Sequence, residues 1–129
     1  MQKQCNCDKL SEMFRMRQEF IDSLRAKYPD AYPEQPVDYA DKKTQQQLRN
    51  IAMKGVEEVF ESLVHFKNWK NHRTQKTQVF DRDAFVEEMV DALNYFMSLL
   101  IMVDVDAEEL FEIYKKKDAI IHERIKNDY

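Results

Sequence analysis

The chain has 129 residues, enough for one domain, and its 20 Lys and Arg against 24 Asp and Glu give a formal net charge of -4. It therefore lacks the basic surplus of a nucleic-acid-binding protein. One Gly and three Pro, beside seven Met and eight Phe, do not supply the turn residues of an all-β fold. We expect a single all-α domain over residues 1–129.

The sequence also bears on the compartment. The most apolar stretch, 89–103, is interrupted by Asp91, Asn94 and Ser98 and is too short to span a bilayer. Cys5 and Cys7 are too close together for a disulfide between them to stabilise the fold, which fits a reducing environment. We therefore expect a soluble, cytoplasmic protein that binds neither membranes nor nucleic acid.

Apolar residues at helical spacing predict four helices, over about residues 8–26, 41–66, 82–103 and 107–127. Three prolines between the first two helices predict an extended connector. Asp81 or Asp83 can cap the third helix, and Asp106 with Glu109 forms a capping box that opens the fourth. The polar, basic segment 67–80 predicts a loop whose cations approach an anion.

The expected core stripes follow the same spacing. The third helix is apolar on most sides, so we expect part of it to pack against a second subunit. The stripes expected to face the core are Leu48, Ala52, Val56, Val59, Leu63 and Phe66 on the second helix; Phe85, Met89, Leu93, Phe96, Leu100 and Val103 on the third; and Leu110, Ile113, Tyr114, Ile120, Ile121 and Ile125 on the fourth.

Two carboxylate pairs have the spacing of neighbours on a helix face. Glu58 and Glu61 stand three apart on the second helix, and Glu88 and Asp91 three apart on the third. Antiparallel packing of these helices would bring all four together. Asp91 lies inside an apolar run, and a buried carboxylate needs compensation, which a metal ion would provide.

Four oxygen ligands without Cys or His suit Mg²⁺ or Mn²⁺ and disfavour structural zinc. A ferritin-like di-iron site fits poorly, because His65 follows Glu61 by four residues instead of three. Each pair alone is more often a solvated helix charge. The two pairs together leave a metal site and a solvated face both open.

Four elements in order resemble the all-α nucleoside triphosphate pyrophosphohydrolases: EEVFE at 57–61, HFKNWK at 65–70, EEMVDALNYF at 87–96 and AEELFEIYKKKDAIIHERIKNDY at 107–129. This superfamily includes the MazG proteins. Within it the chain looks most like the dimeric dUTPases and their phage dCTPase/dUTPase relatives. The resemblance implies a four-helix bundle that forms a homodimer or homotetramer.

The resemblance also implies a reaction, the hydrolysis of a (deoxy)nucleoside triphosphate to a monophosphate and pyrophosphate, with dUTP the best single substrate and nucleotide-pool sanitation the purpose. It implies that Glu58, Glu61, Glu88 and Asp91 are the catalytic residues and hold Mg²⁺, with Glu57 or one of these four orienting the attacking water. The substrate-binding residues that it implies are Lys67, Trp69, Lys70, Lys117, Arg124, Gln18 and Tyr129, and it also matches Tyr114 to an aromatic position of the last motif.

The base pocket departs from the family pattern. Where the dUTPases carry a Gln and an Asn that read uracil, this chain has Arg17 and Ile21, and a shift of one residue gives Gln18 and Asp22. Phe66 replaces the first Trp of the W-K-x-W-K element. Cytosine and purine triphosphates therefore stay open as substrates. The alternative from another class is a non-enzymatic helical dimer that acts as an interaction module.

Overall fold

The computed structural model describes residues 8–73 and 79–127. This part of the chain forms four helices and no strand, which confirms the all-α prediction. Cys5, Cys7 and Tyr129 lie outside the described residues. The helices are α1 (Lys9–Lys27), α2 (Lys42–Leu63), α3 (Arg82–Met102) and α4 (Ala107–Lys126).

Each helix begins after an aspartate that caps it. The carboxylates of Asp8, Asp41, Asp81 and Asp106 each accept a hydrogen bond from a backbone N–H in the first turn. Asp81, and not Asp83, is therefore the cap of α3. These caps explain why the predicted starts agree with the structure to within a residue.

α2 ends at Leu63, earlier than the predicted end near residue 66. The chain leaves the helix through short turns, in which the His65 N–H donates to the Ser62 carbonyl at 3.2 Å. Phe66 then stacks on Phe80, with ring centroids 5.0 Å apart, and meets the edge of Phe85. The aromatic contact thus holds Phe66 beside the start of α3 instead of in a stripe of α2.

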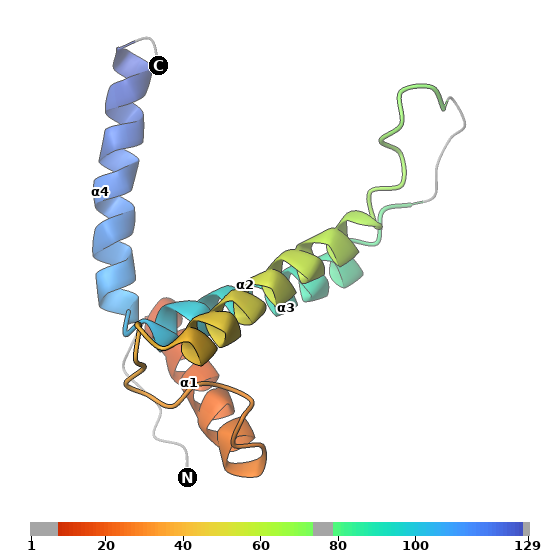
Figure 1. Ribbon diagram of the computed structural model, residues 1–129. Coiled ribbons are helices and arrows are strands. Elements are labelled where there is room, and N and C mark those ends of the chain that lie inside the picture. The colour runs from red at the N-terminus through yellow and green to blue at the C-terminus, as the bar shows by residue number, and fades with distance from the viewer. Residues whose placement is uncertain (1–7, 74–78, 128–129) are drawn as a thin grey trace.

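α2 and α3 form an antiparallel pair that packs along its length, and α1 crosses the end of α3 (Figure 1). Small residues line the seam: Gly55 and Ser62 on α2 and Ala92 on α3 are buried. A Cβ atom on Gly55 would lie 2.9 Å from the Phe96 ring. The two helices therefore approach closely through residues that hydrophobic spacing does not mark.

The apolar core lies where α1 and the proline connector meet the C-terminal half of α3. Arg17 reaches into this region, where its Nε donates to Ser98 Oγ at 2.6 Å. Several predicted stripe residues of α3, including Met89 and Leu93, are exposed instead. The predicted stripe of α3 was wrong there because α2 covers α3 along Ala92. The buried core consists of Phe14, Ile21, Tyr32, Ile51, Met97, Ile101, Met102 and Ala107.

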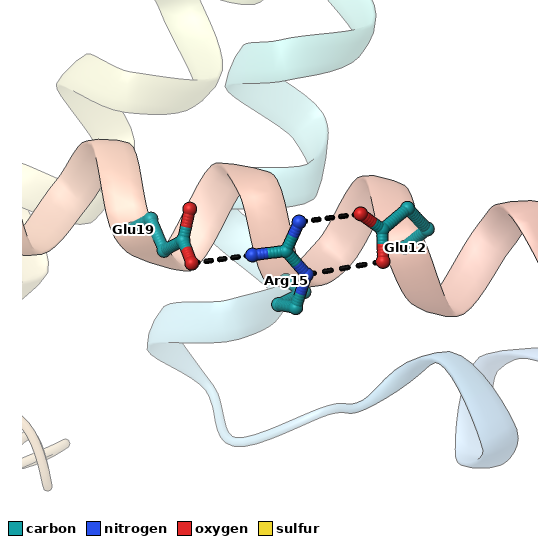
Figure 2. Close-up of polar contacts among 3 residues, drawn as sticks. All are labelled: Glu12, Arg15 and Glu19. Carbon is teal, nitrogen blue, oxygen red and sulfur yellow. Dashed lines mark hydrogen bonds and ion pairs between the residues drawn. The ribbon is translucent and has the colours of Figure 1, made fainter. Parts of the chain in front are cut away.

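The side of α1 that faces the α3–α4 turn carries a pair of linked ion pairs. Arg15 lies between Glu12 and Glu19 and binds both carboxylates (Figure 2). Arg15 lowers the pKa of Glu12, chiefly through the hydrogen bonds that it donates to this carboxylate. Partly exposed ion pairs at helical spacing each stabilise a helix by about 0.2–0.5 kcal/mol.

α4 does not join a four-helix bundle within the described chain. Among the helices it contacts only α1, and it projects away from the α2–α3 pair (Figure 1). Its first turn alone is anchored, through buried Ala107 and through Leu110 packed on the core. The prediction that the other stripe residues face inward was wrong for the isolated chain: Ile113, Tyr114, Ile120, Ile121 and Ile125 are 39–68% exposed.

The turn between α3 and α4 explains why α4 projects away from the α2–α3 pair. The Val105 N–H donates to the Leu100 carbonyl at 3.0 Å, and Asp104 adopts a left-handed backbone with φ of 63°. With Asp106 capping α4 two residues later, the connection is short and hydrogen-bonded. It directs α4 outward.

Candidate active site

The α2–α3 pair brings the four predicted carboxylates into one electrostatic field. The pKa of Glu58 is raised, first by burial and then by the charge of Glu61 on its own helix. The charges of Asp91 and Glu88 on α3 raise it further. Charges on both helices therefore act on Glu58, while the convergence of all four carboxylates on one point stays a prediction.

The four side chains do not all share one environment. Glu58 and Glu88 are half-buried, whereas Glu61 and Asp91 are exposed. The predicted burial of Asp91 was wrong, because its apolar neighbours Met89, Val90 and Leu93 are themselves exposed in the isolated chain. The case for a cation at this place therefore depends on Glu58, because the charges of Glu61, Glu88 and Asp91 all act on its carboxylate.

Glu88 has a partner that the sequence did not reveal. His65 Nε2 lies 2.9 Å from Glu88 Oε2, and both side chains are partly buried. By its spacing from Glu61, His65 is only a poor match to an iron ligand. No periodic signal marks this contact, because His65 follows the last residue of α2.

Tyr95 is a second residue that the sequence missed. Burial raises its pKa, and the charge of Glu58 raises it further. Its ring centroid lies 6.0 Å from the guanidinium carbon of Arg17. Tyr95 follows Asp91 by four residues, and this helical spacing was the available signal.

The donor set fits a hard divalent cation. All four side chains offer oxygen, and a cation would relieve the repulsion that raises the pKa of Glu58. In the described ranges, 8–73 and 79–127, no three His, Cys, Asp or Glu side chains already converge in a geometry that would hold a metal ion. The carboxylates thus share a field without closing on one point.

The predicted residues of the HFKNWK segment lie at the same end of α2 as the carboxylates. Trp69 is largely exposed and lines an apolar hollow with Phe60, Leu63, Val64 and Phe66. Lys70 Nζ lies 5.4 Å from the centroid of the Trp69 ring. Lys67, like Trp69, is exposed. The basic segment therefore begins close to the carboxylates.

Lys117 and Arg124 lie elsewhere. Both stand on the exposed part of α4, which points away from the α2–α3 pair (Figure 1). At 1.5 Å per residue they are about 15 and 26 Å along α4 from Ala107, while Glu88 is about 21 Å along α3 from Met102. The described chain therefore does not bring these two cations to its own carboxylates.

Two pairs of α1 residues could match the base-reading pair of the dUTPases: Arg17 with Ile21, or Gln18 with Asp22. The structure places these two pairs in different surroundings. Ile21 is fully buried in the core, and Arg17 is held by Ser98 and by the Tyr32 hydroxyl at 3.2 Å. Gln18 donates to Asp22 at 2.9 Å and to Gln35 at 3.1 Å. Gln18 lines a hollow between α1 and the start of α4, so it lies away from the carboxylates.

Comparisons of the chain with family models, with curated proteins and with solved structures find no match. The functional interpretation therefore depends on the residues themselves.

Among the described residues, no helix is both long enough and apolar enough to cross a membrane.

Proposed function

We propose that this chain is a nucleotide pyrophosphohydrolase that converts a (deoxy)nucleoside triphosphate to a monophosphate and pyrophosphate. The observation that carries the proposal is the electrostatic coupling of two carboxylate pairs across α2 and α3, in which the charges of Glu61, Glu88 and Asp91 raise the pKa of Glu58. The order of the four sequence elements adds support. The best single substrate is dUTP, with dCTP or a purine triphosphate as the alternative.

Glu58, Glu61, Glu88 and Asp91 would hold Mg²⁺, or Mn²⁺ in its place. When bound, the ion supplies positive charge that offsets the repulsion between these carboxylates and a triphosphate and makes water more acidic. One carboxylate, Glu57 or a member of the four, accepts a hydrogen bond from the attacking water and orients it toward the α-phosphorus.

The basic side chains have a separate task. Lys67 and Lys70 lie at the carboxylate end of α2, where cations neutralise phosphate oxygens that carboxylates would repel. The exposed Trp69 offers an aromatic face beside them. A homodimer or homotetramer is part of this proposal, because the exposed apolar residues of α3 and α4 need a covering surface.

A substrate panel tests the proposal directly. Purified protein should release pyrophosphate, and not orthophosphate, from at least one dNTP, and only when Mg²⁺ or Mn²⁺ is present. Coupled detection of both products over all common NTPs and dNTPs makes the distinction. A complete absence of turnover across the panel would remove the enzymatic interpretation.

The second candidate is an interaction module, and the exposed apolar face of α4 favours it. Thermal melting with and without Mg²⁺ and a non-hydrolysable nucleotide separates the two functions. A ligand that binds only the native state must raise the melting midpoint. An unchanged midpoint favours the interaction module.

A further inference from the structure

Glu88 is held by a residue that lies outside its own helix. The distance from His65 Nε2 to Glu88 Oε2 is 2.9 Å, and both side chains are partly buried. Because an ionised carboxylate can only accept hydrogen bonds, the imidazole N–H is the donor in this contact. The contact therefore connects the segment after α2 to one of the four carboxylates proposed to bind the cation.

The turn that carries His65 is anchored to α3 on both sides of this residue. Backbone N–H groups of the three residues after α2 each donate to a carbonyl in the last turn of the helix. On one side of the turn, the fully buried Ser62 has its Oγ 3.4 Å from Met89 Sδ. On the other side, the ring of Phe66 meets the edge of Phe85, with centroids 4.9 Å apart. The imidazole therefore has a fixed place beside α3.

The hydrogen bond restricts the side chain of Glu88. A glutamate on a helix surface samples several rotamers, and a cation that binds its carboxylate must suppress this freedom. Because His65 already selects one rotamer, less entropy is lost when an ion binds. The carboxylate oxygens keep further lone pairs, so the hydrogen bond does not exclude coordination of a cation.

The position of the donor also opposes the repulsion within the acidic group. Negative charge on Glu88 and Asp91 acts on Glu58 across the two helices. Without a cation, this repulsion favours rotamers of Glu88 that point away from α2. His65 belongs to the segment directly after α2, so its hydrogen bond holds the Glu88 carboxylate against this tendency.

We propose that His65 is a positioning residue, which holds the Glu88 carboxylate in the orientation from which it can bind a divalent cation. His65 does not touch the ion and acts only through Glu88. Hydrogen-bonding partners of metal ligands commonly have this role in proteins. The inference rests on the proposed function for the use of the site, but it concerns the binding of the cation and not the hydrolysis of the nucleotide.

Binding of Mn²⁺ alone tests the proposal without any substrate, through the electron paramagnetic resonance signal of the free ion. His65→Ala should raise the Kd for Mn²⁺ about tenfold or more, as is typical when such a partner is lost. His65→Gln should recover most of the affinity, because its amide N–H can replace the donor. His72→Ala, at an exposed histidine of the same segment, should bind as wild type does. Wild-type affinity in His65→Ala would overturn the proposal.

Two further measurements separate positioning from a general loss of stability. Ile51→Val removes a methyl group from the buried core, so it should lower stability without changing the affinity for Mn²⁺. In a Glu88→Gln background, His65→Ala should weaken binding no further, because the carboxylate through which His65 acts is gone. Water-proton relaxation follows the weak binding of these variants. Equal losses in both backgrounds would show that His65 acts without Glu88 and would overturn the proposal.

Electron spin echo spectroscopy of the Mn²⁺-loaded protein distinguishes a positioning residue from a ligand. A directly bound nitrogen that disappears in His65→Ala would make His65 a ligand and would contradict the proposal. Failure of the proposed function is a separate result. A wild type whose Mn²⁺ affinity depends on His65 and Glu88, but which hydrolyses no triphosphate, leaves this inference standing and removes the enzyme. A wild type that binds no Mn²⁺ removes the cation site and the inference together.

Discussion

His65 Nε2 and Glu88 Oε2 lie 2.9 Å apart, and this contact joins the turn after α2 to α3. It holds one of the four carboxylates from outside its own helix. Near the same place Ser62, which is fully buried, donates from Oγ to the Val59 carbonyl at 2.6 Å. The end of α2 is thus fixed beside the acidic residues of α3 by polar contacts as well as by packing.

Replacing His65 by Ala should lower the free energy of unfolding by about 1 kcal/mol, because a partly buried hydrogen bond to a carboxylate is lost. Urea denaturation measures this change. His72→Ala is the matched control, since His72 is exposed in the same loop. Equal stability of the two variants would mean that the His65–Glu88 contact contributes nothing to the fold.

The raised pKa of Glu58 predicts a pH dependence of stability. In the unfolded chain this carboxyl loses its proton near its ordinary value of 4.5, whereas the folded chain keeps the proton to a higher pH. The unfolded state therefore gives up its proton first, and the metal-free protein should lose stability as the pH rises above 4.5. Thermal melting from pH 4 to 7 should show a smaller loss in Glu58→Gln. If the melting midpoint fell equally with pH in both proteins, the loss of stability would not come from Glu58.

Divalent ions should restore the stability that the metal-free protein loses as the pH rises. At ten times its dissociation constant, a cation that binds only the folded state adds about 1.4 kcal/mol to the free energy of unfolding. Melting at pH 7 with Mg²⁺ should therefore raise the midpoint of wild type more than that of Glu58→Gln. Equal shifts in the two proteins would place the bound ion away from Glu58.

Removing single carboxylates should stop the proposed reaction while the fold is kept. Glu61→Gln, Glu88→Gln and Asp91→Asn should each lower pyrophosphate release by about a hundredfold or more, because each removes negative charge needed to hold the cation. Asp83→Asn is the control on the same helix, since Asp83 is exposed in the first turn of α3. A variant that keeps wild-type turnover does not belong to the cation site.

The close packing of α2 on α3 predicts that substitutions of Gly55 and Phe96 affect stability in a coupled way. Gly55→Ala should destabilise the protein by about 1 kcal/mol, because the new Cβ would lie 2.9 Å from the Phe96 ring and overpacking outweighs the better helix propensity. In a Phe96→Ala background the same change should cost less, because the ring contact is removed and the contact with the Tyr95 Cβ atom at 3.2 Å remains. A double-mutant cycle from urea denaturation measures the coupling, and additive effects would mean that the ring does not limit the approach of the helices.

The positions of the four helices could be predicted from the sequence alone. Their caps at Asp8, Asp41, Asp81 and Asp106 are local hydrogen bonds between a side chain and the backbone three residues on, so they can be recognised from neighbours in the chain. The carboxylate spacings on α2 and α3 are local in the same sense. Local periodicity was therefore enough to predict which acidic residues share a helix face.

Which helix faces are covered depends on how the helices pack in space, and the sequence pattern did not predict it. Asp91 lies among apolar residues in sequence and is nevertheless exposed, because α2 packs over Ala92 and contacts Met89 through Ser62, and Asp91 lies on another side of α3. α4 also has an apolar stripe, yet the Asp104 turn directs most of this helix away from the α2–α3 pair. Burial depends on where a second element lies, and that position is set by turns and by contacts such as His65 with Glu88, which hydrophobic periodicity does not encode.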